Sequence, residues 1–385
     1  MDRAQFGQAA PGRLVPTVAG VLAFLPAPPR SDHQLTPAAV HLLDRASNAL
    51  GMLSGAGRLL PNPHLLIAAY LRREAVLSSR IEGTQSTIAD VYAAEAGQTQ
   101  LFRDTEDVRE VQSYIAAHEL GLRRLGDLPL SLRLVGEMHA QLMQGVRGAE
   151  QTPGRFRRSQ NFIAPPGSGI ADAIYVPPPP QELARLLSDL ELFMHDRALP
   201  PLVQAALLHY QFEAIHPFRD GNGRVGRLLV SLFLCERGLL AQPLLYLSAY
   251  FERTRPDYYE LLLRVSTRGD WDSWIRYFLE GVRVQATDAV EDAQRLLAVR
   301  ERHRQALVAS KARPAALQLL DQLFLNPYVT ARSAAELLAV SDPTVRSAIA
   351  DLRAHGILVE VSGRKWGQLF LATEILRALR GHEEV

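Results

Sequence analysis

Residues His216–Arg227 read H-P-F-R-D-G-N-G-R-V-G-R and are followed directly by the apolar run L-L-V-S-L-F-L-C. The spacing of apolar residues from Leu202 to Ile215 predicts a helix before this stretch. Pro217 and three glycines interrupt that helix, so we expect a turn at His216 and a new helix from about Asn222. The polar stretch is therefore expected to form the N-terminus of a core helix.

The first turn of the new helix is predicted to bind an anion. Its backbone N–H groups lack partners within the helix, and the positive end of the helix dipole adds to their attraction for negative charge. Gly221 and Gly223 let a ligand approach the backbone closely. Arg224 and Arg227, three residues apart, add two guanidinium groups suited to phosphate. The pattern therefore predicts a phosphate site.

Two further side chains indicate a reaction site. Asp220 supplies a carboxylate for a Mg²⁺ ion shared with substrate phosphates, and His216 is suited to act as a general base. Each residue taken singly also has a structural interpretation, because G-N-G commonly forms a turn. A zinc site built from His209, His216 and Asp220 is disfavoured, since the histidine spacing is not the i, i+4 spacing of two-histidine zinc sites.

Composition excludes several classes of protein. The chain has 385 residues, 47% hydrophobic and 22% charged, with a formal net charge of +1, which is unlike a nucleic-acid coat or a membrane-surface protein. The single cysteine, Cys235, cannot form a disulfide within one chain. The N-terminus lacks a signal-like apolar core and no segment approaches eighteen uninterrupted apolar residues. We therefore expect a cytoplasmic protein without a membrane span.

The apolar patterns divide the chain into four parts. Residues 1–35, rich in proline and glycine, predict an extended N-terminal arm. Residues 36–125 predict a helical region, and residues 126–305 predict a mainly helical domain that carries the polar stretch. Within the latter, residues 152–180 contain two strand-like runs around a Pro/Gly loop, a pattern typical of a β-hairpin.

Residues 306–385 follow a different pattern. Helix, helix, turn, helix and then two strand-like pieces is the order of a winged helix-turn-helix. Between residues 313 and 373, six basic and five acidic residues nearly balance, whereas a DNA-binding module usually has one basic face. DNA binding, protein docking and dimerisation are all left open for this part.

The polar stretch resembles the Fic family signature, H-P-F-x-[DE]-G-N-G-R-x-x-R, at every fixed position. The resemblance implies a mainly α fold, namely a Fic-type helical core with a β-hairpin flap, followed here by the small winged helix-turn-helix domain. In that family the core transfers a nucleotide monophosphate, usually AMP from ATP, to a protein hydroxyl. The implied reaction is AMPylation of a target protein, or of the chain itself, with Mg²⁺ as cofactor.

The resemblance also implies roles for individual residues. His216 would deprotonate a Ser, Thr or Tyr hydroxyl of the target, Asp220 would hold Mg²⁺, and Phe218 would anchor the loop. P-D-Y-Y-E-L-L-L resembles an aromatic pair near the family's adenine pocket, with a buried aromatic pair as the competing interpretation. The implied ATP-binding residues are Gly221, Asn222, Gly223, Arg224, Val225, Gly226, Arg227, Tyr258 and Tyr259.

Two segments outside the polar stretch extend the resemblance. Asn161, Phe162 and Ile163 lie where the family's flap holds the target by backbone pairing. S-S-R-I-E-G at Ser78–Gly83 resembles the family's inhibitory motif [ST]-x-x-x-E-[GN], with Ser78, Glu82 and Gly83 at the fixed positions. By position, Glu82 would pair with Arg227 and block the seating of the γ-phosphate.

Other functions remain open at this point. The same site could remove AMP instead of adding it, or do both. A nucleotide-sensing regulator that binds DNA is a further alternative, although such a sensor has no need of the base His216. The target protein, the choice of nucleotide and the oligomeric state, for which the family suggests a homodimer, are not determined by the residues.

Overall fold

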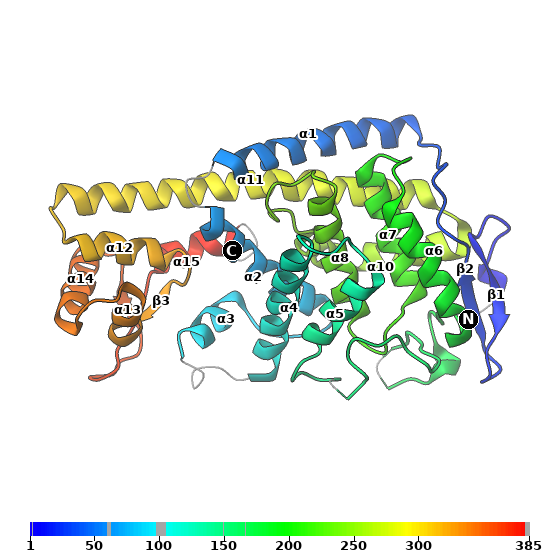
Figure 1. Cartoon of the computed structure of the whole chain (residues 1–385), viewed down its shortest axis with the longest axis horizontal. Helices are drawn as coiled ribbons and strands as arrows, with labels where there is room; N and C mark the ends of the chain where they lie inside the picture. Colours follow the sequence, from blue (N-terminus) through cyan, green and yellow to red (C-terminus); the bar gives the residue numbers. More distant parts are fainter. Residues whose placement is uncertain (2, 60–62, 98–104, 149, 166, 382–385) are drawn as a thin grey trace.

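The computed structural model describes residues 1, 3–59, 63–97, 105–148, 150–165 and 167–381. The molecule is elongated and mainly helical (Figure 1). Helix α11 (Trp271–Ala309) runs along most of its length, with α1 (Pro37–Leu59) packed beside it. A hairpin of β1 and β2 lies at one end and a small C-terminal unit at the other, so the central helices lie between them.

The central helices build the core that positions the polar loop. α7 is buried on nearly all sides, as its continuous apolar sequence requires, and packs against α6, α8 and α11. The indole Nε1 of Trp274 on α11 donates to the Ala206 carbonyl on α7 at 2.9 Å. The central helices are α2 (Pro63–Ile81), α3 (Ile88–Glu95), α4 (Thr105–Arg124), α5 (Leu132–Leu142), α6 (Leu183–His195), α7 (Pro201–Ile215), α8 (Asn222–Glu236), α9 (Ser248–Arg253) and α10 (Arg255–Arg268).

The predicted helix boundaries agree closely with the structure around the polar stretch. α7 ends at Ile215 and α8 begins at Asn222, as the proline and glycine positions predict. Helix α3 was not expected, although Thr87 is its N-cap and forms a capping box with Asp90. Short 3₁₀ turns occur at Arg3–Gln5, Ile170–Asp172 and Pro180–Glu182.

The N-terminal arm is a β-hairpin and not the extended segment predicted from its proline and glycine content. β1 (Gly12–Pro16) and β2 (Leu22–Pro26) pair antiparallel, with Gly12 opposite Pro26. Phe24 is fully buried, and its N–H donates to the Val176 carbonyl at 2.9 Å. The arm is therefore hydrogen-bonded to the second strand-like run of the predicted flap.

The flap is less regular than the hairpin predicted for it. Ile163 and Tyr175 form one isolated antiparallel pair, in which the Ile163 N–H donates to Tyr175 O at 2.8 Å. Prolines on both sides cannot donate to a ladder, so pairing ends after this bridge. The two strand-like runs predicted within residues 152–180 are therefore part of a loop closed by a single pair.

The C-terminal unit contains the predicted helices and strands in the predicted order, with an added strand before its second helix and an added last helix. A three-stranded antiparallel sheet has the order β3-β5-β4. The elements are α12 (Pro314–Leu323), β3 (Tyr328–Thr330), α13 (Ala331–Leu338), α14 (Asp342–Ala354), β4 (Val359–Glu360), β5 (Leu369–Leu371) and α15 (Thr373–Arg380). Its assignment as a winged helix-turn-helix stays a prediction. Residue 305, the predicted end of the preceding domain, lies inside α11.

Among the described residues, none of the helices has both the length and the apolar character needed to cross a bilayer.

Candidate active site

The polar loop is a sharp turn between two core helices. α7 ends at Ile215 and is capped by His216, which has a left-handed backbone (φ 50°), and α8 starts after Gly221, which is also left-handed (φ 73°). The positive φ at Gly221 explains the glycine, since other side chains rarely adopt it. The loop therefore presents the N-terminus of α8, with its unpaired N–H groups, beside His216.

Asn222 and Phe218 close this loop from the inside. The Asn222 side chain accepts a hydrogen bond from Phe218 N at 2.8 Å and donates one to Phe218 O at 2.9 Å. The Phe218 ring is fully buried and stacks on the His139 ring, with centroids 3.7 Å apart. Asn222 is thus placed to shape the loop through its own side chain, and Phe218 anchors it as expected.

Arg227 is paired with the end of α2. Its Nη2 lies 2.7 Å from Oε1 of Glu82, and its Nε donates to Ser78 Oγ at 2.8 Å. The Arg227 side chain is only 2% exposed. Burial alone would raise the pKa of Glu82, but the charge and hydrogen bond of Arg227 outweigh it and hold that pKa below its usual range.

Gly223 makes this contact sterically feasible. A Cβ atom at Gly223 would collide with Oε1 of Glu82. The structure therefore brings Ser78, Glu82, Gly223 and Arg227 together at the first turn of α8. Gly83 has a positive φ (103°) and turns the chain away directly after Glu82.

Arg224 lies in a second acidic environment. Its side chain is 5% exposed, and its nearest carboxylates are Glu110 on α4 at 3.6 Å and Asp220 at 3.8 Å. In the described part of the chain, no hydrogen-bond acceptor meets its Nε or Nη1. These two buried donors are therefore not saturated by hydrogen bonds from the described residues.

Comparison with known proteins agrees with this geometry. Residues 40–123 match the Fic/DOC family N-terminal profile, and residues 129–234, which include the whole polar loop, match the Fic/DOC family profile. This chain carries a Fic domain.

Relatives of the chain have the same family name. "Protein adenylyltransferase Fic" of Drosophila virilis is 27% identical over 208 residues, which cover 52% of this chain and 39% of the relative. The Drosophila melanogaster protein of that name is 26% identical over 208 residues, covering 52% and 38%. The matched region thus spans about two fifths of the length of these relatives.

Solved structures show the shared fold. A Fic family protein from Desulfovibrio desulfuricans superposes with a TM-score of 0.58 at 22% identity, covering 90% of this chain and 98% of that one. A Fic domain containing signaling protein from Bacteroides thetaiotaomicron superposes with a TM-score of 0.50 at 18% identity, covering 66% and 95%. The first likeness extends the common architecture beyond the Fic domain itself.

In the Fic domain His216 is held neutral. Its side chain is partly buried, and desolvation lowers its pKa to about 4, while the Arg157 charge acts in the same direction. A neutral imidazole can accept a proton throughout the neutral range. Nδ1 of His216 is buried without a hydrogen-bond partner in the described chain.

Asp220 is the acidic side chain of the Fic domain that best fits a metal role. Its side chain is 49% exposed, and Oδ1 accepts a hydrogen bond from Gly221 N at 2.6 Å. No cluster of three or more His, Cys, Asp or Glu side chains suited to a metal occurs in the residues described. A metal here would need phosphate oxygens as well as Asp220, and this donor set fits Mg²⁺, which is commonly held by one or two carboxylates and substrate phosphates.

Two residues that fix the Fic loop were missed by sequence reasoning. Arg157 is buried and donates to the carbonyls of His216 at 2.8 Å and Pro178 at 2.7 Å. His139 accepts from Gly154 N at 2.8 Å through Nδ1, so its Nε2 donates to the Asp220 carbonyl at 3.1 Å. The G-R-F-R-R-S segment contained a signal, since an arginine beside flap residues can bind backbone carbonyls.

The remaining predicted residues of the Fic domain have different surroundings. Tyr258 is 1% exposed and its hydroxyl lies 2.8 Å from His209 Nε2, whereas Tyr259 is 44% exposed. Tyr258 is thus in the core and Tyr259 faces outward. The flap residues Phe162 and Ile163 are exposed, and the Asn161 amide donates to the Phe218 carbonyl at 3.3 Å. Their roles toward nucleotide and target stay predictions.

Proposed function

We propose that this Fic domain transfers AMP from ATP to a Ser, Thr or Tyr hydroxyl of a protein, and that Glu82 holds the activity down. Relatives named protein adenylyltransferase support the reaction class. The observation that carries the proposal is the ion pair between the buried Arg227 and the partly exposed Glu82 at the first turn of α8. Glu82 thereby pairs with the guanidinium group that we expect to bind phosphate at the N-terminus of α8.

The loop has the groups that such a transfer requires. The target hydroxyl would form a bond to the α-phosphorus as the bond to pyrophosphate breaks, and neutral His216 would take the hydroxyl proton. Arg224, Arg227 and the N–H groups at the start of α8 would stabilise the negative charge that gathers on the phosphates. Mg²⁺ held by Asp220, when bound, supplies further positive charge to them.

Inhibition follows from competition for Arg227. Its Nη2 contacts both Glu82 Oε1 and the Ser78 carbonyl. A γ-phosphate would have to displace Glu82 to reach this guanidinium, and a charge-assisted contact contributes about 1.5–3 kcal/mol. Removal of the Glu82 carboxylate is therefore expected to free Arg227 for the nucleotide.

The test uses wild type, Glu82→Gly, and Glu82→Gly with His216→Ala, each incubated with Mg²⁺ and ATP labelled on the α-phosphate. We expect protein-bound label to rise in Glu82→Gly. We expect it to fall about 10²–10⁴-fold when the base is also removed. If Glu82→Gly shows no label on itself or on lysate proteins, AMP transfer is wrong, and AMP removal from a modified protein is the next activity to assay.

A further inference from the structure

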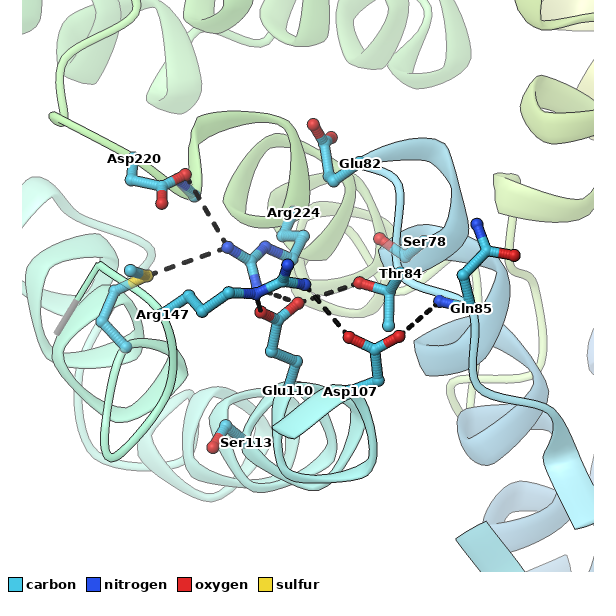
Figure 2. Close-up of polar contacts among 12 residues, drawn as sticks. Ser78, Glu82, Thr84, Gln85, Asp107, Glu110, Ser113, Arg147, Asp220 and Arg224 are labelled. Atoms are coloured by element: carbon cyan, nitrogen blue, oxygen red, sulfur yellow. Dashed lines mark hydrogen bonds and ion pairs between the residues drawn. The ribbon is translucent and has the colours of Figure 1, made fainter. Parts of the chain in front are cut away.

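Two acidic residues of α4, Asp107 and Glu110, face the Fic loop (Figure 2). They are one helical turn apart, and each residue is only 5% exposed. Buried carboxylates need partners because isolated burial of a charge is costly. Their partners lie on the segment after α2, on the loop after α5, and on α8.

Glu110 contacts three of these partners. Its Oε2 accepts a hydrogen bond from Thr84 Oγ1 at 2.9 Å and lies 3.6 Å from Nη1 of Arg224. Its Oε1 accepts from Arg147 Nε at 2.9 Å. The Glu110 carboxylate therefore links Arg224 on α8 to Thr84, which lies two residues after Glu82.

Asp107 reinforces the same connection. Its Oδ2 accepts a hydrogen bond from the Gln85 N–H at 2.6 Å, and its Oδ1 accepts from Arg147 Nη2 at 3.1 Å. Thr84 and Gln85 follow the left-handed turn at Gly83. The chain directly after Glu82 is thus fastened to α4 through one side-chain and one backbone hydrogen bond.

The distance between Glu110 and Arg224 matters for the ligand. At 3.6 Å the two groups form an ion pair but not a good hydrogen bond. Arg224 keeps Nε and Nη1 without a hydrogen-bond partner among the described residues. Glu110 therefore balances the buried charge of Arg224 and fixes its place without saturating the hydrogen-bond donors of the guanidinium.

We propose that Glu110 is a positioning residue that acts on both sides of the site. It orients Arg224 for the phosphates of the nucleotide. Through Thr84 it also holds the inhibitory segment, residues 78–85, against the loop. The inference rests on the proposed nucleotide site, but it concerns binding and does not depend on transfer of AMP.

The first arm of the test measures the orientation of Arg224. Binding of α,β-methylene-ATP with Mg²⁺, and of AMP, is measured by calorimetry in Glu82→Gly and in Glu82→Gly with Glu110→Gln. We expect about tenfold weaker binding of the analogue, because one charge-assisted phosphate contact is weakened, and a change in AMP binding of less than about twofold. Glu119→Gln, on the exposed face of the same helix, is the matched control in that background. Equal affinity for the analogue, or an equal loss for AMP, overturns the role.

The second arm measures the hold on the inhibitory segment and leaves both charges in place. Thr84→Val removes the hydroxyl that donates to Glu110. With Glu82 present, we expect analogue binding about fivefold tighter than wild type, because loss of one hydrogen bond weakens the inhibited state. In the Glu82→Gly background the same change is expected to have no effect. An equal effect in both backgrounds contradicts the proposed link to Glu82.

The outcomes separate this inference from the proposed function. If the analogue binds with the expected dependence on Glu110 and Thr84 but no protein is labelled, the positioning role stands and AMP transfer falls. If Glu82→Gly labels protein but binding is indifferent to Glu110, transfer stands and the positioning role falls. If no variant binds the analogue, both fall.

Discussion

Two arginines at the start of α8 and two arginines of the C-terminal unit have the same chemistry and opposite surroundings. In the loop, Arg224 and Arg227 are 5% and 2% exposed, and each has an acidic partner distant in sequence, Glu110 and Glu82 respectively, although Arg224 also lies near Asp220. In the C-terminal unit, Arg332 and Arg346 are 90% and 65% exposed and pair with acidic residues four positions away on their own helices.

This difference decides what each arginine can do. A buried guanidinium needs a negatively charged partner, because leaving it unpaired costs a large amount of free energy. A phosphate that replaces the acidic partner can therefore be bound strongly. An exposed i, i+4 pair contributes about 0.3–0.5 kcal/mol and is screened by salt. Residue type alone therefore does not identify a binding arginine, and its surroundings do.

Removal of Arg227 should give the largest effect. In the Glu82→Gly background, Arg227→Ala is expected to weaken binding of Mg²⁺·ATP about a hundredfold, because a charge-assisted contact to phosphate is lost. Calorimetric titration measures the change, with Arg346→Ala in the same background as the control. Similar losses for the two arginines would break the comparison.

Arg157 sharpens the comparison as a buried arginine whose hydrogen bonds go to the protein. It donates to the carbonyls of His216, Pro178 and Ser159, and burial lowers its pKa to about 10. Arg157→Met should destabilise the fold by about 2 kcal/mol through the unsatisfied carbonyls. Thermal unfolding measures this, with exposed Arg158→Met as the matched control. Unchanged stability would show that these carbonyls find other donors.

The loop could be predicted in detail because its determinants are local. Pro217, Gly221 and the apolar spacing on both sides are enough to locate the turn and the start of α8. Glu82 could be paired with Arg227 only through the family resemblance. The contacts of Arg224 with Glu110, and of Phe218 with His139, could not be predicted, since they join segments that are brought together by packing of α4 and α5 on α8.

The N-terminal hairpin and the flap are harder to predict from the sequence, because contacts between distant segments shape them as well. In the N-terminal hairpin, Phe24 of β2 donates to the Val176 carbonyl, a contact between segments far apart in the sequence. In the flap, strand-like composition suggested two strands, but the flanking prolines cannot extend the pairing beyond Ile163 and Tyr175. Tertiary contacts decided these elements more than propensity did.

The pH dependence of the reaction tests whether His216 is kept neutral by its surroundings in the loop. A base is active when deprotonated, so a pKa of about 4 leaves His216 active above that pH. Its ordinary value near 6.5 would instead cause about a tenfold loss by pH 5.5. Glu82 raises the pKa of His216, so its removal lowers that pKa further. For Glu82→Gly we expect kcat/KM to change less than about twofold between pH 7 and 5.5. Glu213, whose pKa burial raises to about 8, stays protonated in this range.

A decline in kcat/KM centred near pH 6.5 would contradict the buried, neutral state of His216. The same variant's far-UV circular dichroism across the range separates titration from unfolding. A flat profile would show that the pKa of His216 lies well below its ordinary value, as desolvation and the Arg157 charge together favour.

The smallest effect is expected at Arg346, an exposed arginine of the C-terminal unit. A large effect there would contradict the difference drawn between buried and exposed arginines. Its Nε lies 2.6 Å from Asp342 Oδ2 on the same exposed helix, α14. Arg346→Ala should change the free energy of unfolding by less than about 0.5 kcal/mol.

The same substitution tests DNA binding by α14. If α14 contacts DNA, Arg346→Ala should weaken duplex binding and reduce the slope of log affinity against log salt by about one. Titration of a labelled duplex at several salt concentrations measures both quantities. Because Asp342 already neutralises this arginine, we expect no such change. A reduced slope would show that DNA displaces the acidic partner at α14, as phosphate is proposed to displace Glu82 in the Fic loop.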